Sequence, residues 1–226
     1  MTENNKVDLQ TIQQLNEMTN DQRSGHFPVF LNIKNRKCLI VGGGEAAVEK
    51  AKVLQSYGAY VVLVAKEHDE FVDNCRNVEL HVRSFRHVDV KNCVLAIVVG
   101  EDEETANDVV KACRASDVLC TVIDHFDKGD FIFPYIIQKG CITTAVSSGG
   151  KDPALAMSTK KIIESYAPDY IDEVSQNMGK WHKYIGSKVR DSKIRKKIYN
   201  ELFDISKSQG IITEEHIEDL IKYYTK

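Results

Sequence analysis

A glycine-rich segment between Gly42 and Ala47 offers the clearest chemistry in the sequence. Its pattern, G-x-G-x-x-A, is typical of loops that bind the pyrophosphate of a dinucleotide, and it lies between the apolar run KCLIV and the run EAAVEKAKVLQ. In such loops the first glycine permits a tight turn, the second lets backbone approach the pyrophosphate, and a small third residue lets a helix pack closely on a strand. We therefore expect Gly42, Gly43, Gly44 and Ala47 to form a cofactor site with the N–H groups of the following helix. A glycine turn that binds nothing is the alternative.

The position that normally contacts the ribose of the cofactor is occupied by a basic residue. An acidic residue at the end of the second strand, about twenty residues after the glycines, usually holds the ribose hydroxyls of NAD. Here the second apolar run, AYVVLVAKE, has Lys66 at that place and Glu67 one position later. Lys66 could accept a 2′-phosphate, so these residues leave the choice between NAD and NADP open. An ordinary exposed lysine at a strand end is the alternative.

Two further polar segments follow apolar runs, where the catalytic sites of open α/β sheets lie. In the first, Asp124 ends the run LCTVID and could be a general base, or it could cap the following turn, HFDKG. The second precedes a helix that we expect to begin at Pro153, so its hydroxyl, N–H and ammonium groups could hold a carboxylate. A helix-entry loop whose glycines serve only its conformation is the alternative. The residues of this second segment are Ser147, Ser148, Gly149, Gly150 and Lys151.

The elements that must position these residues alternate in type from about Phe27 onward. Apolar runs that predict strands alternate with amphipathic runs that predict helices, a pattern typical of a parallel sheet with crossover helices. The predicted strands are KCLIVGG, AYVVLVAK, VELHVRSF, CVLAIVVG and LCTVID, and the predicted helices between them include EAAVEKAKVLQSYG and ETANDVVKACRAS. After Asp124 come two apolar runs, FIFPYIIQKG and CITTAVSS, and a helix that should end near Tyr166 because Pro168 follows. The remainder is predicted to be helical, divided at Gly186 and Gly210.

We therefore predict an α/β protein: a Rossmann-type parallel sheet, a small strand-containing dimerisation segment, whose two apolar strands need a partner to cover them, and a helical C-terminal tail. The expected division is a polar N-terminal extension (1–25), an NAD-binding domain (26–126), a dimerisation segment (127–168) and a helical C-terminal domain (169–226).

Composition and charge narrow the classes of partner. The chain has 226 residues, 42% of them hydrophobic, and no apolar run long enough to span a bilayer, and its first twenty residues lack the layout of a signal peptide. We expect a soluble cytoplasmic protein that binds no membrane.

The six cysteines are scattered without a CxxC pair, so we expect reduced core residues and no metal site. Lys180 to Lys197 carries eight basic residues and one acid, which suits an anionic partner or a solvated helix. It has no interleaved aromatic platform, so we expect no nucleic acid partner.

Several long segments, in order and in spacing, resemble the precorrin-2 dehydrogenase family, which includes the N-terminal half of siroheme synthases. The resemblance runs from Phe27 to about Tyr166 and rests on FPVFLNIKNRKCLIVGGGEAAVEKAKVL, LAIVVGEDEETAN, VIDHFDKGDFIFPYII and AVSSGGKDPALA. The sequence departs from the family in its polar N-terminal extension, in KD where a TSP-type loop is more usual, and in the tail from about Asp169.

The resemblance implies a homodimer that swaps strands, bound NAD, and a tetrapyrrole substrate in the cleft. By position, Asp124 matches the proposed catalytic carboxylate of the family and Ser148 a serine of its SSGG loop. The positions that match NAD-contacting residues are Glu45, Ala46, Lys66 and Glu67. The implied activity is the NAD-dependent oxidation of precorrin-2 to sirohydrochlorin in siroheme biosynthesis. The base would be Asp124, and the segment from Ser147 to Lys151 would hold substrate carboxylates.

Three other functions compete with a dehydrogenase alone. A bifunctional dehydrogenase and ferrochelatase would insert metal in the same cleft, although His125 has no HxxH or HxxxH partner. A non-catalytic NAD-sensing regulatory domain would open with the same glycine loop, but normally has an acidic residue at the end of the second strand. A short-chain dehydrogenase is suggested only by YxxxK at Tyr184–Lys188, which lies beyond the sheet and contains a glycine.

Overall fold

The structure is a computed structural model that describes residues 25–67, 70, 77–123, 125, 127–168, 170–209 and 212–226. Asp124 and almost all of the N-terminal extension lie outside the described residues. The chain forms two compact units. The first comprises the residues up to Phe133 together with Ser148–Asp152, and the second comprises Pro134–Ser147 and Pro153–Lys226. No helix among the described ranges is both long enough and apolar enough to cross a membrane.

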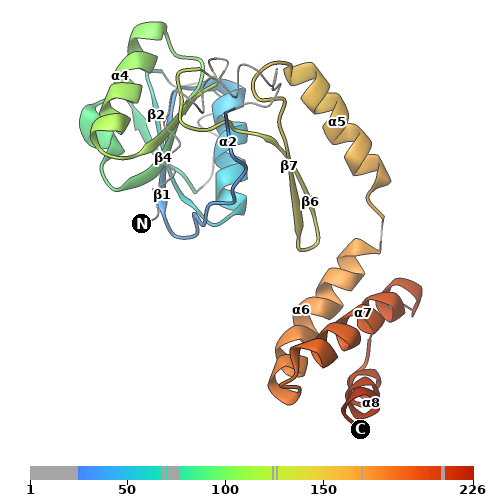
Figure 1. Cartoon of the computed structure of the whole chain (residues 1–226). Helices are drawn as coiled ribbons and strands as arrows, with labels where there is room; N and C mark the ends of the chain where they lie inside the picture. The colour runs from blue at the N-terminus through green and yellow to red at the C-terminus, as the bar shows by residue number, and fades with distance from the viewer. Residues whose placement is uncertain are drawn as a thin grey trace, which may run out of the picture. The chain divides into compact units, whose positions relative to one another are not determined.

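A five-stranded parallel sheet forms the centre of the first unit (Figure 1). Its strand order is β3-β2-β1-β4-β5, so the chain moves outward on one side of β1, returns, and continues on the other side. The strands are β1 (Lys37–Val41), β2 (Tyr60–Ala65), β3 (Glu79–Val82), β4 (Cys93–Val98) and β5 (Leu119–Val122). The five strands predicted from the apolar runs and the Rossmann-type order are thus confirmed. The order also places the end of β1 between the ends of β2 and β4.

Two helices of the first unit cover opposite faces of the sheet. Alternate residues of β1 point to different cores: Leu39 packs in the core that includes α4 (Glu103–Ala115), and Ile40 in the core that includes α2 (Gly44–Ser56). Because both faces are covered, the central strands are apolar throughout rather than at alternate positions. The small residues Ala47 and Ala51 are fully buried and let α2 approach the sheet closely.

Four of the cysteines belong to these cores. Cys38, Cys93, Cys113 and Cys120 are buried free thiols, and burial raises the pKa of Cys38 to about 11. A thiol with such a pKa is not a nucleophile at neutral pH. The burial of all four agrees with the prediction that they are core residues. Cys141, in contrast, is exposed.

The second unit begins with an antiparallel hairpin and a helix. The hairpin pairs β6 (Tyr135–Lys139) with β7 (Ile142–Val146), and α5 spans Pro153–Tyr166, as its flanking prolines predicted. The turn of the hairpin contacts the helix that follows α5 in the chain. Ser175 of that helix accepts, through Oγ, a hydrogen bond of 3.1 Å from the backbone N–H of Cys141. A Cβ at Gly140 would lie 2.4 Å from the same oxygen, so only glycine fits there.

Three helices complete the second unit around a core of their own. They are α6 (Ile171–Lys188), α7 (Ser192–Gln209) and α8 (Glu214–Thr225). The prediction that Gly186 divides the helical tail was wrong, because α6 continues through it to Lys188. A glycine inside a helix costs about 1 kcal/mol, which the complete burial of the neighbouring Ile185 offsets. The break comes instead before Ser192, where Asp191 Oδ1 accepts a hydrogen bond of 2.7 Å from the Lys193 N–H of the next helix.

A partly buried ion pair stabilises the connection between β3 and β4. Arg83 donates two hydrogen bonds, of 2.8 and 2.7 Å, to the Asp89 carboxylate, which also accepts one of 2.9 Å from the Arg86 N–H. Burial alone would raise the pKa of the Asp89 carboxyl, but these hydrogen bonds lower it below its ordinary value. The pair therefore stabilises the fold above the ordinary carboxyl pKa of about 4, and this contribution is lost as the pH falls through the lower, folded-state value.

We predict that Asp89→Asn lowers the free energy of unfolding at pH 7 by about 2 kcal/mol, because it leaves the Arg83 guanidinium without its charged partner. Urea unfolding followed by circular dichroism measures this loss, which should shrink at low pH. Asp108→Asn is the matched control, since its 3.0 Å pair with His87 is exposed and should change stability little. Equal effects of the two substitutions would contradict the prediction.

Candidate functional site

The glycine loop lies at the carboxyl end of β1, where the backbones of two strands come very close. A Cβ on Gly42 would lie 1.8 Å from the carbonyl oxygen of Val99, and the φ of Gly42 is +126°, so both space and conformation require glycine. The N–H of Gly42 donates a hydrogen bond of 2.8 Å to the Val64 oxygen, and the N–H of Val99 donates one of 2.9 Å to the Val41 oxygen. The loop is therefore held between the ends of β2 and β4.

The helix that follows the loop begins without a side-chain cap. Gly43 is the N-cap residue of α2 and makes no side-chain hydrogen bond to the first turn. Gly44 has a φ of +76°, and a Cβ built on it would have no atom within 4 Å. Glu45 and Ala46 are exposed, whereas Ala47 is fully buried against the sheet. A glycine facing open space at a helix N-terminus fits the phosphate groups of a dinucleotide.

Lys66, the first residue after β2, is held in a cluster of acceptors. Its Nζ lies 2.7 Å from Asp102 Oδ2, 2.8 Å from Glu101 Oε2 and 3.1 Å from Thr105 Oγ1. Hydrogen bonds to Asp102 and then to Glu101 raise the pKa of Lys66 above its ordinary value, and the same contact lowers the pKa of Asp102. Glu67 is exposed.

Sequence reasoning did not identify Glu101 and Asp102 as residues of this edge. The signal was present, because both follow the apolar run CVLAIVV of β4, at the same edge of the sheet as Lys66. An acidic residue was sought only after β2, where the usual pattern places it.

The described residues before and after Asp124 make hydrogen bonds to β4 and β5. The N–H of Ile123 donates a hydrogen bond of 2.9 Å to the Val98 oxygen, which places the end of β5 beside the end of β4. Farther on, the N–H of Asp130 donates one of 2.6 Å to the Cys120 oxygen, and the Cys120 N–H donates one of 2.9 Å to Asp130 Oδ2. Asp124 itself is outside the described residues, so its catalytic role remains a prediction.

The structure divides the predicted carboxylate-binding loop between the two units. Ser148 to Asp152 belong to the unit of the sheet and the glycine loop, whereas Ser147 ends the hairpin portion of the other unit. Ser148 Oγ accepts a hydrogen bond of 3.0 Å from the Asp152 N–H, immediately before α5, and Gly149 and Gly150 have φ of +70° and +81°. Ser148 and the two glycines thus shape the entry to α5, while Lys151 is exposed.

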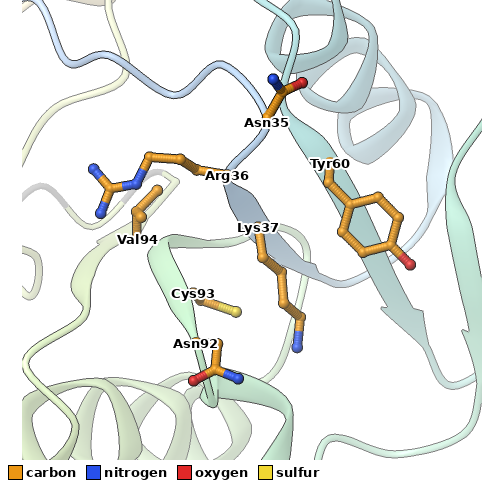
Figure 2. A pocket seen from close by; sticks show the side chains of 7 residues that line it. All are labelled: Asn35, Arg36, Lys37, Tyr60, Asn92, Cys93 and Val94. Carbon is orange, nitrogen blue, oxygen red and sulfur yellow. The ribbon is translucent and has the colours of Figure 1, made fainter.

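Two hollows are lined by residues other than those of the glycine loop. One, of about 610 Å³, is lined by Lys37, Tyr60 and Cys93 among others, at the amino ends of β1, β2 and β4 (Figure 2). Ligands of open α/β sheets bind at the carboxyl ends, so this hollow is on the wrong edge for the predicted chemistry. The other, of about 540 Å³, lies between α6 and α7 and is lined in part by the basic residues Lys183 and Arg195. Within the described ranges no group of three or more His, Cys, Asp or Glu residues could hold a metal ion.

Comparison with known proteins agrees with this geometry. Residues 29–135 match the family described as "Putative NAD(P)-binding". The chain is 31% identical over 193 residues to the siroheme synthase of Tolumonas auensis, covering 84% of this chain and 41% of that protein. It is 37% identical over 147 residues to the siroheme synthase of Nitrosomonas eutropha, a match that covers 63% of this chain and 31% of that protein. The chain is thus similar, over most of its own length, to a part of these siroheme synthases. It spans about two fifths of the length of the first of these relatives.

A solved structure shows the same fold over almost its whole length. The precorrin-2 dehydrogenase SirC superposes with a TM-score of 0.66 at 21% sequence identity, covering 88% of this chain and 99% of SirC. The predicted fold class, with its parallel sheet, small hairpin and helical C-terminal region, is thereby confirmed. The resemblance drawn from the sequence segments is confirmed by the siroheme synthase relatives.

We predict that Gly44→Asp weakens the binding of NAD at least tenfold, about 1.4 kcal/mol, because a carboxylate at this position would occupy the space of the pyrophosphate and repel it. Isothermal titration calorimetry measures the affinity. Gly58→Asp is the matched control for backbone strain, because Gly58 has a similar φ of +78° but follows the other end of α2. An unchanged affinity in folded Gly44→Asp would refute the placement of the cofactor.

Proposed function

We propose that the chain is a precorrin-2 dehydrogenase, which oxidises precorrin-2 to sirohydrochlorin with NAD as the hydride acceptor. The observation that carries the proposal is the glycine loop, in which Gly42 admits no side chain and Gly44 faces open space at a helix N-terminus. The names of the relatives, siroheme synthase and precorrin-2 dehydrogenase, support the choice of substrate. The segments VIDHFDKGDFIFPYII and AVSSGGKDPALA support the same choice of substrate independently. They resemble the precorrin-2 dehydrogenase family, and a dinucleotide-binding loop can occur without them.

The reaction removes a hydride and a proton from the macrocycle. When bound, NAD supplies the nicotinamide that takes the hydride. The residues proposed to hold its pyrophosphate are those of the loop from Gly42 to Ala47, with Glu45 and Ala46 in the first turn of α2. Asp124 is the proposed base that accepts the proton, because it lies two positions after the end of β5 in the sequence and matches the proposed catalytic carboxylate of the family.

The substrate carries carboxylates that need hydrogen-bond donors and positive charge. We assign this task to the loop from Ser147 to Lys151, whose serine hydroxyls and backbone N–H groups are donors and whose lysine is cationic. Ser148 Oγ already accepts a hydrogen bond from the Asp152 N–H, and a hydroxyl that accepts one bond can still donate its own proton. Binding of substrate at this loop would therefore not require the entry to α5 to open.

The activity is tested by incubating the protein with freshly made precorrin-2, first in the presence of NAD and then in the presence of NADP. Formation of sirohydrochlorin, followed by its spectrum together with the absorbance of the reduced nicotinamide, is the expected result. Binding of NAD with no spectral change on addition of precorrin-2 would instead favour a regulatory dinucleotide-sensing domain. Adding ferrous or cobaltous ion afterward separates a dehydrogenase alone, which we expect, from one that also inserts metal.

We predict that Asp124→Asn lowers the rate of this oxidation by roughly 10²- to 10⁴-fold, the range for a lost general base, and leaves the affinity for NAD unchanged. Stopped-flow absorbance at saturating NAD measures the rate. Asp127→Asn, an exposed residue of the following turn, is the matched control and should be near wild type. Activity near wild type in Asp124→Asn would show that Asp124 serves only to cap the turn.

We also propose that the protein is a homodimer through the hairpin and α5. Only Ala156 of α5 is buried in the single chain, while Leu155, Ile162 and Tyr166 are 60%, 57% and 82% exposed. Ile142 of β7 is 51% exposed as well. A second copy of the chain would cover these apolar side chains, in the manner that the family resemblance implies.

We predict that the wild type is a dimer at micromolar concentration and that Leu155→Glu with Ile162→Glu makes it a monomer, because burying two carboxylates in an apolar interface is strongly unfavourable. Analytical ultracentrifugation measures the mass. Lys161→Glu, which changes an exposed charge of the same helix, should stay dimeric. A wild-type monomer at this concentration would overturn the proposal.

A further inference from the structure

The ammonium group of Lys66 has no hydrogen-bond donor to spare. A lysine ammonium has three N–H donors, and Lys66 has three acceptors within hydrogen-bond distance: Asp102 Oδ2 at 2.7 Å, Glu101 Oε2 at 2.8 Å and Thr105 Oγ1 at 3.1 Å. A 2′-phosphate could bind Lys66 only by displacing one of these partners. The basic residue at the ribose edge is therefore already satisfied by the protein.

Both carboxylates of the cluster are fixed in place. The side chain of Glu101 is only 8% exposed, so it cannot turn away freely into solvent. Asp102 is the N-cap residue of α4, and its Oδ1 accepts a hydrogen bond of 2.7 Å from the Thr105 N–H. One ammonium and two carboxylates leave the cluster with a net charge of −1, which repels an anion even though a lysine lies at its centre.

The cluster also lies where the ribose of a dinucleotide belongs. Lys66 directly follows β2, and Glu101 and Asp102 lie between β4 and α4, so their ion pairs join the ends of the two strands that flank β1. The glycine loop begins at the end of β1, and Gly42 hydrogen-bonds to Val64, two residues before Lys66. In dinucleotide-binding sheets, the residue at the end of the second strand contacts the ribose 2′ position.

We propose that Glu101 and Asp102, by holding Lys66, exclude the 2′-phosphate of NADP and are the residues that select NAD. The acidic group that other folds place at the end of the second strand comes here from the loop after β4. The inference rests on the proposed use of a nicotinamide dinucleotide, and it assigns the selection to residues outside the β2 position. A phosphate monoester carries a charge of about −1.5 to −2 at neutral pH. The two carboxylates would therefore repel it, and the ammonium group of Lys66 would have no free N–H to offer it.

The experiment measures dissociation constants for NAD and NADP by isothermal titration calorimetry on the full chain. The variants are Glu101→Gln, Asp102→Asn and their double, and the double combined with Lys66→Met. We expect wild type to bind NAD at least tenfold more tightly than NADP. The double variant should shift the ratio at least tenfold toward NADP, because its amides free Lys66 to pair with the phosphate. Adding Lys66→Met should reverse that shift, since the cation is then gone.

Controls separate this effect from general charge and from folding. Glu103→Gln removes one negative charge at the next position in the chain, but Glu103 pairs with Lys128 at 2.7 Å, so the ratio should stay near wild type. Asparagine is itself a good N-cap residue, so Asp102→Asn should keep α4 intact. Thermal unfolding checks each variant, and the single variants decide the question if the double does not fold.

Three outcomes would overturn the proposal. These are equal binding of NAD and NADP by wild type, an unchanged ratio in the folded Glu101 and Asp102 variants, or an equal shift in Glu103→Gln. Failure of the dehydrogenase proposal looks different: the ratio would respond to the variants as expected, while precorrin-2 would remain unoxidised with either dinucleotide.

Discussion

The close approach of two backbones at Gly42 is the constraint on which the candidate site depends. The carbonyl of Val99 occupies the space in which any side chain at position 42 would lie, so β1 can end beside β4 only if this residue is glycine. That contact sets the start of the loop, and the loop sets the start of α2. Gly42 also donates its N–H to Val64 of β2, so the loop starts between the ends of β2 and β4, after which Lys66 and its two carboxylate partners lie.

Those parts of the fold that depend on local patterns could be predicted from the sequence. The central strands β1, β2 and β4 are almost entirely apolar runs, and the parallel arrangement follows from the amphipathic helices between the strands. The bounds of α5 follow from a proline at each end. The expected break at Gly186 was wrong for a related reason: a glycine often ends a helix, but here the apolar face of Trp181 and Ile185 continues past it to Val189, which is buried in the same core as residues of α7 and α8.

The ion pairs of Lys66 could not be predicted from local pattern. Its partners are 35 and 36 positions away in the sequence, and they meet only because β2 and β4 lie on either side of β1. From the sequence alone, Lys66 could have bound a 2′-phosphate. The acceptors around its ammonium group argue against that binding. In the same way, Ser147 and Ser148 are neighbours in the sequence but belong to different compact units, which no local pattern indicates.

The attachment of the hairpin to α6 has a consequence for assembly. Ser175 accepts the Cys141 N–H and closes over Gly140, and Lys139 Nζ donates a hydrogen bond of 3.2 Å to the Ala167 oxygen. The hairpin and the helical bundle therefore belong to one compact unit and are joined at the turn of the hairpin and just after α5. In the proposed homodimer, these two contacts would link the hairpin of the interface to the helical bundle of the same chain. A side chain at Gly140 would displace Ser175 and so weaken the link between the interface and the bundle, without a direct contact to the parallel sheet.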